Sequence, residues 1–141
     1  MYKKLAKSNV IYSNNLKVLS LFYRILGYFV NQYHDLAKEI KNKKIYIQTL
    51  SIKKIRELKK MYFKIDNFTD TITLIYDDSV FIFICLNVIY NNSRKYKVSY
   101  KEELLRVLIH SLLHSCGFYE SKEMIILQEE FLKKILKKIK R

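Results

Sequence analysis

Two of the three histidines in this chain, His110 and His114, stand four residues apart. Positions i and i+4 lie on one face of a helix, one turn apart, so the two imidazoles can point at a common position. Gly117 follows and suits the left-handed residue that ends a helix. The chain can then return and bring Glu120 to the same position. Two neutral imidazoles and a carboxylate, with a fourth position open to water, are typical of a zinc site.

The same spacing has a simpler explanation, because two histidines on an amphipathic helix can share a face by coincidence. The zinc-peptidase motif helps to define the chemistry: in it, a glutamate follows the first histidine and acts as general base. Here that position is Ser111, so peptidase chemistry of this type lacks its base. The pattern therefore indicates a metal site without a peptidase reaction.

The composition favours a basic globular protein that binds a polyanion. Half of the 141 residues are apolar, which argues against intrinsic disorder and is enough for one hydrophobic core. The formal net charge is +14, and nucleic acid is the polyanion that Lys and Arg most often contact. The alternative is a codon bias, since Lys, Ile, Asn and Tyr all have A/T-rich codons. We expect a single domain over residues 1–141.

No segment has the features of a membrane span or a secreted protein. Cys85 and Cys116 form neither a CxxC pair nor a disulfide framework, which fits a reducing cytosol. The apolar run 80–89 is about half the length that a helix needs to cross a bilayer. Residues 18–30 are interrupted by Arg24 and lack a small-residue cleavage site, so we expect no signal peptide. A cytoplasmic location without membrane contact is the expectation.

The elements that must position the histidines are predicted on both sides of them. Ser99 and Glu102 form a capping box, so the histidine-bearing helix begins near residue 100. Its other face is apolar and predicts a central, buried helix that holds the histidines rigidly. Ser121 can cap a last helix with an apolar seam of its own. The apolar face of the first helix comprises Leu105, Leu108, Ile109, Leu112 and Leu113, and the seam of the second comprises Met124, Leu127, Phe131, Ile135 and Ile139.

A long N-terminal helix is expected to pack beside them. Residues 1–15 have the pattern of an irregular or short extended start. Apolar residues at three- and four-residue steps then predict one helix over 16–40, capped by Asn14 or Asn15. His34 near its end is expected to be solvated.

The middle of the chain predicts the sheet. Residues 44–50 alternate as a strand, and a lysine-rich helix over 52–62 follows. β-Branched residues 71–76 and the continuous apolar run 80–86 predict a hairpin whose second strand is buried. Residues 91–97 are expected to form a loop. The predicted fold is α+β: a small mixed β-sheet from about residue 44 to 86, packed by the long N-terminal helix and the central His-bearing helix.

The stretch around the histidines, HSLLHSCGFYE, resembles the signature of the YbeY endoribonucleases, the bacterial rRNA maturation factors. That signature reads H-G-x-L-H-L-x-G-Y-D-H in most members. His110, His114 and Gly117 match it. Glu120 stands where the third ligand is usually His, and it resembles the acidic residue that members from the Bacteroidetes lineage carry there.

The resemblance covers roughly residues 45–135. Residues 66–73, DNFTDTIT, resemble the family's D-x-x-T-D-V-L-S-F run, and residues 103–109 resemble its E-L-x-R-L-x-x run. Three departures bear on activity more than on the fold. The family's Gly after the first His is Ser111, its Gly-Asp before the hairpin strand is Val80-Phe81, and an Arg implicated in activity is Phe63.

The resemblance implies a single-strand-specific endoribonuclease in which His110, His114 and Glu120 hold one Zn²⁺ per chain and activate a water. It implies precursor 16S rRNA, near its 3′ end, as substrate and the ribosome as partner, in rRNA maturation and ribosome quality control. The ligand set also suits iron or nickel. Thr69 and Asp70 either orient a metal ligand through a hydrogen bond or only shape their turn.

Two other functions remain as alternatives. One is a catalytically weak RNA- or ribosome-binding factor with a structural metal, which Phe63 and the missing glutamate after His110 favour. The other is a metallohydrolase whose substrate is not RNA. Arg106, one turn before His110, is either a phosphate contact near the metal or the ion-pair partner of Glu102 or Glu103.

Overall fold

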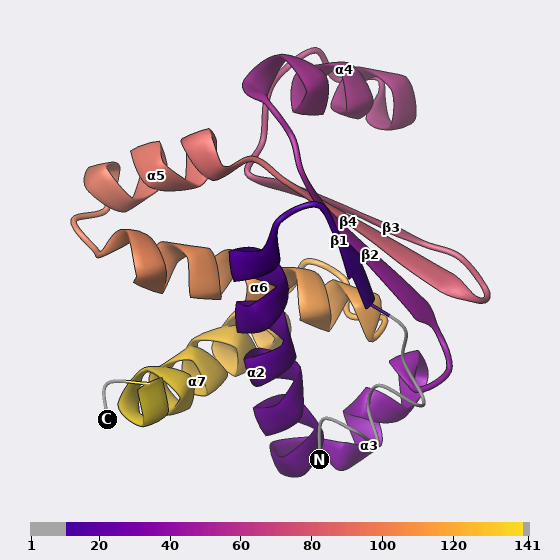
Figure 1. Cartoon of the computed structure of the whole chain (residues 1–141), viewed down its shortest axis with the longest axis vertical. Coiled ribbons are helices and arrows are strands. Elements are labelled where there is room, and N and C mark those ends of the chain that lie inside the picture. Colours follow the sequence, from indigo (N-terminus) through magenta and orange to yellow (C-terminus); the bar gives the residue numbers. More distant parts are fainter. Residues whose placement is uncertain (1–10, 140–141) are drawn as a thin grey trace.

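Four strands, six α-helices and a short 3₁₀ helix alternate along the part of the chain that the computed structural model describes, residues 11–139 (Figure 1). No helix within these residues is long and apolar enough to cross a membrane. In chain order the elements are β1 (Ile11–Ser13), α2 (Leu16–Gln32), α3 (His34–Ala37), η1 (Lys38–Ile40), β2 (Lys44–Thr49), α4 (Ile52–Phe63), β3 (Thr71–Ile75), β4 (Ser79–Ile84), α5 (Leu86–Lys95), α6 (Tyr100–Ser115) and α7 (Lys122–Ile139).

The sheet is mixed, with the strand order β1-β2-β4-β3. The pairs β1–β2 and β2–β4 are parallel, and β3 and β4 form the predicted antiparallel hairpin. The α+β class is therefore confirmed. The expected sheet limits were wrong at one end, because β1 comes from the N-terminal segment and pairs with β2. Residues 1–10 of that expected extended start lie outside the described residues.

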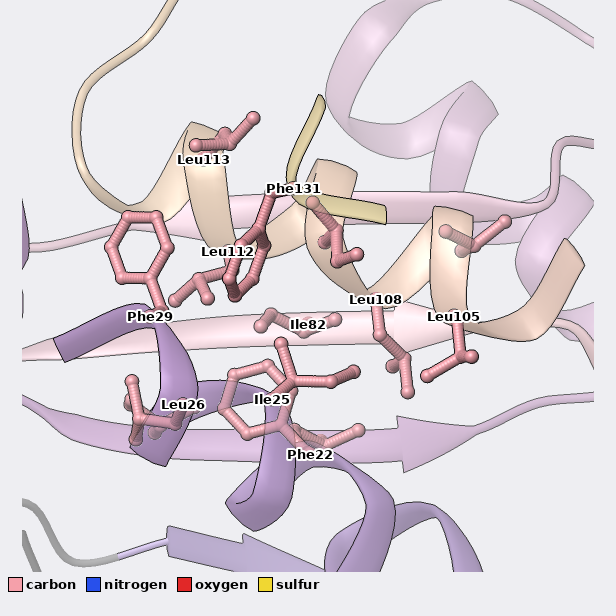
Figure 2. Close-up of a cluster of buried hydrophobic side chains, with 14 of the residues drawn as sticks. Phe22, Ile25, Leu26, Phe29, Ile82, Leu105, Leu108, Leu112, Leu113 and Phe131 are labelled. Carbon is pink, nitrogen blue, oxygen red and sulfur yellow. The ribbon is translucent and has the colours of Figure 1, made fainter. Parts of the chain in front are cut away.

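The two faces of the sheet are covered differently. Helices α2, α6 and α7 lie on one side, where their side chains gather over Ile82 of β4 (Figures 1 and 2). Helix α4 lies on the other side and packs Ile55 against Ile72, Cys85 and Val88. Helix α6 is thus the central buried helix that the sequence predicted. Its buried residues include Leu105, Leu108, Ile109, Leu112 and Leu113.

The prediction of one helix over 16–40 was wrong. Helix α2 ends at Gln32, and Tyr33 leaves the helical region with φ −131° and ψ 56°. The Tyr33 ring packs against Phe29 and Phe131, with ring centroids 5.3 and 5.5 Å away. The short helices α3 and η1 then keep Ala37 and Ile40 buried. Burial at helical spacing continues through the break, so the sequence pattern does not reveal it.

The expected loop at residues 91–97 is also wrong, because α5 runs to Lys95. Its polar residues Asn91 and Asn92 have low helix propensity and dominated the prediction. Val88, Ile89 and Ser93 nevertheless form one buried face. The Ser93 hydroxyl donates a hydrogen bond to the Tyr90 carbonyl at 2.6 Å, which satisfies it in place. Tertiary burial therefore overrides local propensity here.

Strand β4 is buried on one face rather than on both. Val80, Ile82 and Ile84 are buried, whereas the alternate residues Phe81 and Phe83 are only partly covered. Phe81 stacks on Tyr46 of β2 with 4.7 Å between ring centroids. Aromatic side chains on this second face made the run continuously apolar in sequence, so the difference in burial between the two faces of this central strand was hidden.

The start of α2 gives a first testable prediction. The Asn15 side chain accepts a hydrogen bond from the Val18 amide at 3.1 Å, whereas Asn14 bonds to Thr49 of β2. Asn15 is therefore the N-cap. We expect Asn15→Ala to lower the free energy of unfolding by about 1 kcal/mol in urea denaturation, since a helix-end amide loses its acceptor. Asn15→Asp keeps the acceptor and serves as the control; an equal loss in both variants would contradict the capping role.

Candidate metal centre

The end of α6 brings the two histidines and Glu120 together. His110 and His114 lie one turn apart on α6, and Gly117 adopts the left-handed φ of 98° that the sequence predicted. The amides of Gly117 and Phe118 donate to the carbonyls of His114 and Leu113, at 2.9 and 3.1 Å. This turn reverses the chain and returns Glu120 to the histidine face.

The three side chains converge on one position. Glu120 Oε1 lies 2.8 Å from Nε2 of His110 and 2.8 Å from Nε2 of His114, and the two Nε2 atoms are 3.1 Å apart. Tetrahedral zinc with bonds of about 2.0–2.1 Å places its ligand atoms about 3.3 Å apart. Shifts of a few tenths of an ångström, within side-chain freedom, would therefore admit an ion. Within residues 11–139 these three residues form the one group of His, Cys, Asp or Glu ligand atoms close enough for this.

The hydrogen bonds behind the imidazoles fix their tautomers. Nδ1 of His110 lies 2.7 Å from Gln128 Oε1, and Nδ1 of His114 lies 2.9 Å from the Phe118 carbonyl oxygen. The Gln128 amide nitrogen donates to Glu129 Oε2 at 3.0 Å, which orients the amide with its oxygen toward His110. Each Nδ1 therefore carries the hydrogen, and each Nε2 presents a lone pair. Two lone pairs and a carboxylate oxygen then share one point, which is an arrangement that a cation stabilises.

Gln128 is the site residue that sequence reasoning missed. It lies on α7, eighteen positions from His110, and it is 5% exposed. A buried amide in a seam of Met124, Leu127 and Phe131 is the signal that could have found it, because buried polar groups require partners. Its partner cannot be identified without knowing how α7 packs on α6.

The Glu120 carboxylate is the exposed member of the three. Its side chain is 66% exposed, against 19% for His110 and 23% for His114. Burial raises the pKa of Glu120, but the two imidazoles outweigh this effect when they are protonated and donate from Nε2, so the pKa lies below its ordinary value. The carboxylate is therefore ionised at neutral pH. Because its side chain is mostly exposed, it takes no part in the hydrophobic core.

A cavity of about 430 Å³ opens beside the three residues. Strand β3 forms its floor, and Asp70 lies at the strand's start. Burial raises the pKa of Asp70, and the charge of His110 opposes this shift. The Thr69 hydroxyl donates to the Thr71 carbonyl at 3.4 Å, which fits the turn-shaping interpretation for Thr69. The imidazole hydrogen bonds described above come from α7 and from the turn after α6 instead.

Arg106 forms ion pairs with three glutamates. Its guanidinium lies 3.2 Å from Glu102, 2.8 Å from Glu103 and 3.0 Å from Glu129. The hydrogen bonds that Arg106 donates to Glu129 raise the pKa of Arg106 most. Of the two interpretations of Arg106, the structure contains the ion pair, with both expected partners and a third from α7. Arg106 is not among the residues that line the cavity at the histidines.

Ser111 fits the site at the position where most family signatures have Gly. Its side chain is fully buried, and its hydroxyl lies 3.0 Å from both the Thr71 hydroxyl and the Val107 carbonyl. This side chain connects α6 to β3, so the departure from Gly is accommodated by a hydrogen bond. Burial raises the pKa of the neighbouring Cys116 thiol to about 12, which leaves it neutral and outside the ligand set.

The comparison with known proteins places the chain in a class of RNA endonucleases. Residues 7–136 match the family model of "Endoribonuclease YbeY", and the chain belongs to that family. An Endoribonuclease YbeY of Thermosipho melanesiensis is 38% identical over 114 residues, which cover 74% of this chain and 80% of that protein. One of Azobacteroides pseudotrichonymphae is 41% identical over 81 residues, 53% of this chain and 58% of that protein.

A solved structure shares the fold. The solution structure of TM1509 from Thermotoga maritima superposes with a TM-score of 0.64 at 23% identity, covering 94% of this chain and 91% of that one. Family membership makes RNA the substrate class and endonucleolytic hydrolysis the reaction class. It also agrees with the His110, His114 and Glu120 group as one that can bind a metal.

Proposed function

We propose that this chain is a zinc-dependent, single-strand-specific endoribonuclease whose ion is held by His110, His114 and Glu120. The observation that carries the proposal is the convergence of two Nε2 atoms and Glu120 Oε1 on one point while both Nδ1 atoms are already hydrogen-bonded. Three protein ligands leave a fourth position open, which is the pattern of a catalytic rather than a structural zinc site.

The residues of the chain have distinct parts in this mechanism. When bound, zinc supplies an activated water and polarises a phosphoryl oxygen. Gln128 and the Phe118 carbonyl hold the protons on the two Nδ1 atoms and keep both Nε2 lone pairs aimed at the ion. The exposed Glu120 completes the set from the solvent side, next to the cavity through which an RNA strand can approach.

The finer substrate assignment rests on the family resemblance and on charge. We propose precursor 16S rRNA, near its 3′ end, as the substrate, with the ribosome as partner in rRNA maturation and quality control. A net charge of +14 supports an RNA backbone as the ligand. A single domain over residues 1–141 and a cytoplasmic location, where ribosomes assemble, complete the proposal.

Cleavage of one RNA sequence in single-stranded and in duplex form tests the proposed endoribonuclease activity. Purified chain, loaded with zinc, should cut an unstructured RNA oligonucleotide and leave the same sequence intact in a duplex. His114→Ala should reduce cleavage at least ~1,000-fold, the range expected when a metal-activated nucleophile is lost. Activity that survives in His114→Ala would point to a contaminating nuclease and remove the support for this site.

A binding factor with little catalysis is the second candidate. It is favoured by Phe63, which stands where the family often has an Arg implicated in activity, and by Ser111 after the first histidine. In the assay above, this candidate predicts tight, salt-sensitive RNA binding with no product from either wild type or His114→Ala.

Loss of the Gln128 amide should weaken the metal site without removing a ligand. We expect Gln128→Met, which fills similar volume but leaves the His110 Nδ1–H without its acceptor, to lower zinc affinity about 10- to 100-fold. Competition with a chromophoric chelator measures this. Gln32→Met changes an exposed glutamine of α2 and should leave affinity unchanged; equal affinities in both variants would show that Gln128 does not orient His110.

A further inference from the structure

The cavity beside the histidines has a second wall, which α4 provides. Lys59 and Phe63 line it together with His110, His114 and Glu120. These two α4 residues stand at i and i+4, so they lie on the same helix face, one turn apart. A cation and an aromatic ring therefore face the same hollow as the proposed zinc ligands, from the opposite side.

Lys59 is the one Lys or Arg among the described residues that line this cavity. Its ammonium group has no ion-pair partner within residues 11–139. The adjacent Lys60 differs, because it is exposed outside the cavity and its charge helps to lower the pKa of Asp66. Lys59 thus offers a positive charge without an ion-pair partner in the cavity that His110 and His114 also line, and such a charge can contact a phosphate.

Phe63 is an aromatic side chain that belongs to neither buried hydrophobic cluster. It is 49% exposed, and it is the last residue of α4, since Lys64 adopts the left-handed φ of 60° that ends the helix. Ile65 follows on the same cavity wall. The loop is held against the helix by Arg56, whose Nε lies 2.8 Å from Asp66 Oδ1. A half-exposed ring on the cavity wall offers a surface on which a base can stack.

The scaffold holds these two side chains at a set distance from the histidines. Ile55, one turn before Lys59, is fully buried against Ile72 of β3. Strand β3 is in turn connected to α6 through the Thr71–Ser111 hydrogen bond of 3.0 Å. Helix α4, the cavity floor and the histidine helix therefore form one packed unit.

We propose that this α4 wall binds one unpaired nucleotide of a single-stranded RNA, with Lys59 on its phosphate and Phe63 stacked on its base. The inference rests on the proposed function and adds the groups that select the strand. A base inside a duplex has both faces covered by its neighbours, so only an unpaired base can stack on Phe63. Positive charge on Lys59 complements the phosphate, and the ring accepts any base. Single-strand preference would then come from α4 rather than from the ion.

Two neighbouring residues of α4 serve as matched controls for Phe63 and Lys59. Tyr62 is also 49% exposed and does not line the cavity, and Lys60 carries the same charge as Lys59 outside it. Four variants, Phe63→Leu, Tyr62→Leu, Lys59→Gln and Lys60→Gln, therefore separate a cavity effect from a general loss of aromatic area or charge. All four positions are on the surface or partly buried, so the fold should survive each change.

The experiment measures RNA binding by metal-free protein in chelator, with a short oligonucleotide that carries 2-aminopurine, whose fluorescence falls when it stacks. Phe63→Leu should weaken binding about 10-fold and abolish the quench, as expected for loss of one base–aromatic stack. Phe63→Trp should restore both. Lys59→Gln should reduce the slope of log affinity against log salt by about 0.7. Tyr62→Leu and Lys60→Gln should match wild type.

The outcomes separate this inference from the proposed function. If zinc-loaded wild type cleaves RNA while Phe63→Leu retains the quench and the affinity, the inference is wrong and the enzyme assignment stands. If Tyr62→Leu loses as much RNA affinity as Phe63→Leu, or Lys60→Gln as much as Lys59→Gln, then α4 binds RNA without a defined site. That result would also overturn the inference. If no RNA is cleaved but the quench depends on Phe63, the nucleotide site is supported and the enzyme assignment fails.

Discussion

Glu120→Ala should leave a folded chain that no longer retains zinc. Wild type purified without chelator is expected to contain about one zinc per chain. Removal of Glu120 Oε1, which lies 2.8 Å from both Nε2 atoms, leaves two ligands and should cost at least ~100-fold in zinc affinity, more than loss of a group behind a ligand. RNA cleavage should fall with the metal. Elemental analysis and competition with a chelator measure the first effect, and the oligonucleotide assay measures the second.

Two further variants make that experiment specific. Glu120→His installs the ligand type that most family signatures carry there, so zinc should be kept. Glu130→Ala removes an exposed carboxylate of α7 that is outside the cavity and should change nothing. Because the Glu120 side chain is 66% exposed and its contacts are screened by water, the thermal stability of metal-free Glu120→Ala should stay close to that of metal-free wild type. If wild type purified without chelator contained no zinc, the zinc assignment would be wrong.

Arg106→Met should destabilise the protein by about 3 kcal/mol, the largest stability effect that we expect of a single charged residue here. The reason is Glu103, whose side chain is 5% exposed and pairs with the guanidinium at 2.8 Å. Burial raises the pKa of Glu103 and Arg106 opposes this, so removing Arg106 leaves a buried carboxylate uncompensated. Urea denaturation at neutral pH gives the change in the free energy of unfolding.

The pH dependence of that loss has a defined sign. Without Arg106, the folded-state pKa of Glu103 should rise further above its unfolded value. Ionised Glu103 then lowers the stability of the fold as the pH rises through that folded-state pKa. At lower pH the carboxyl group is protonated and lowers the stability little. Burial raises the pKa of Glu129, but hydrogen bonds from Arg106 outweigh it and lower the net value, so wild type loses this contribution in acid. The Arg106→Met deficit should therefore shrink toward pH 4.

An exposed arginine provides the comparison. Arg24→Met on α2 should change the free energy of unfolding by less than about 0.5 kcal/mol, since the Arg24 side chain is exposed and makes no ion pair within residues 11–139. A similar deficit in both variants, or an Arg106→Met deficit that is constant between pH 4 and 7, would show that the three glutamates do not depend on Arg106.

The sequence by itself determined the proposed metal ligands. His110, His114, Gly117 and Glu120 lie within eleven residues, and the geometry of one helical turn plus one left-handed residue is enough to bring them together. The caps at Ser51, Ser99 and Ser121 are equally local, because each side chain reaches an amide three positions along. Local patterns of this kind can be interpreted without a fold.

Only the tertiary structure decided what surrounds those ligands. Gln128 reaches His110 from another helix, Glu129 adds a third partner to Arg106, and Lys59 and Phe63 meet the histidines across β3. The same holds for β1, whose pairing with β2 joins residues over thirty positions apart, and for α5, which burial keeps helical. Such contacts depend on how whole elements pack, and side-chain periodicity along one element carries no information about which other element covers it.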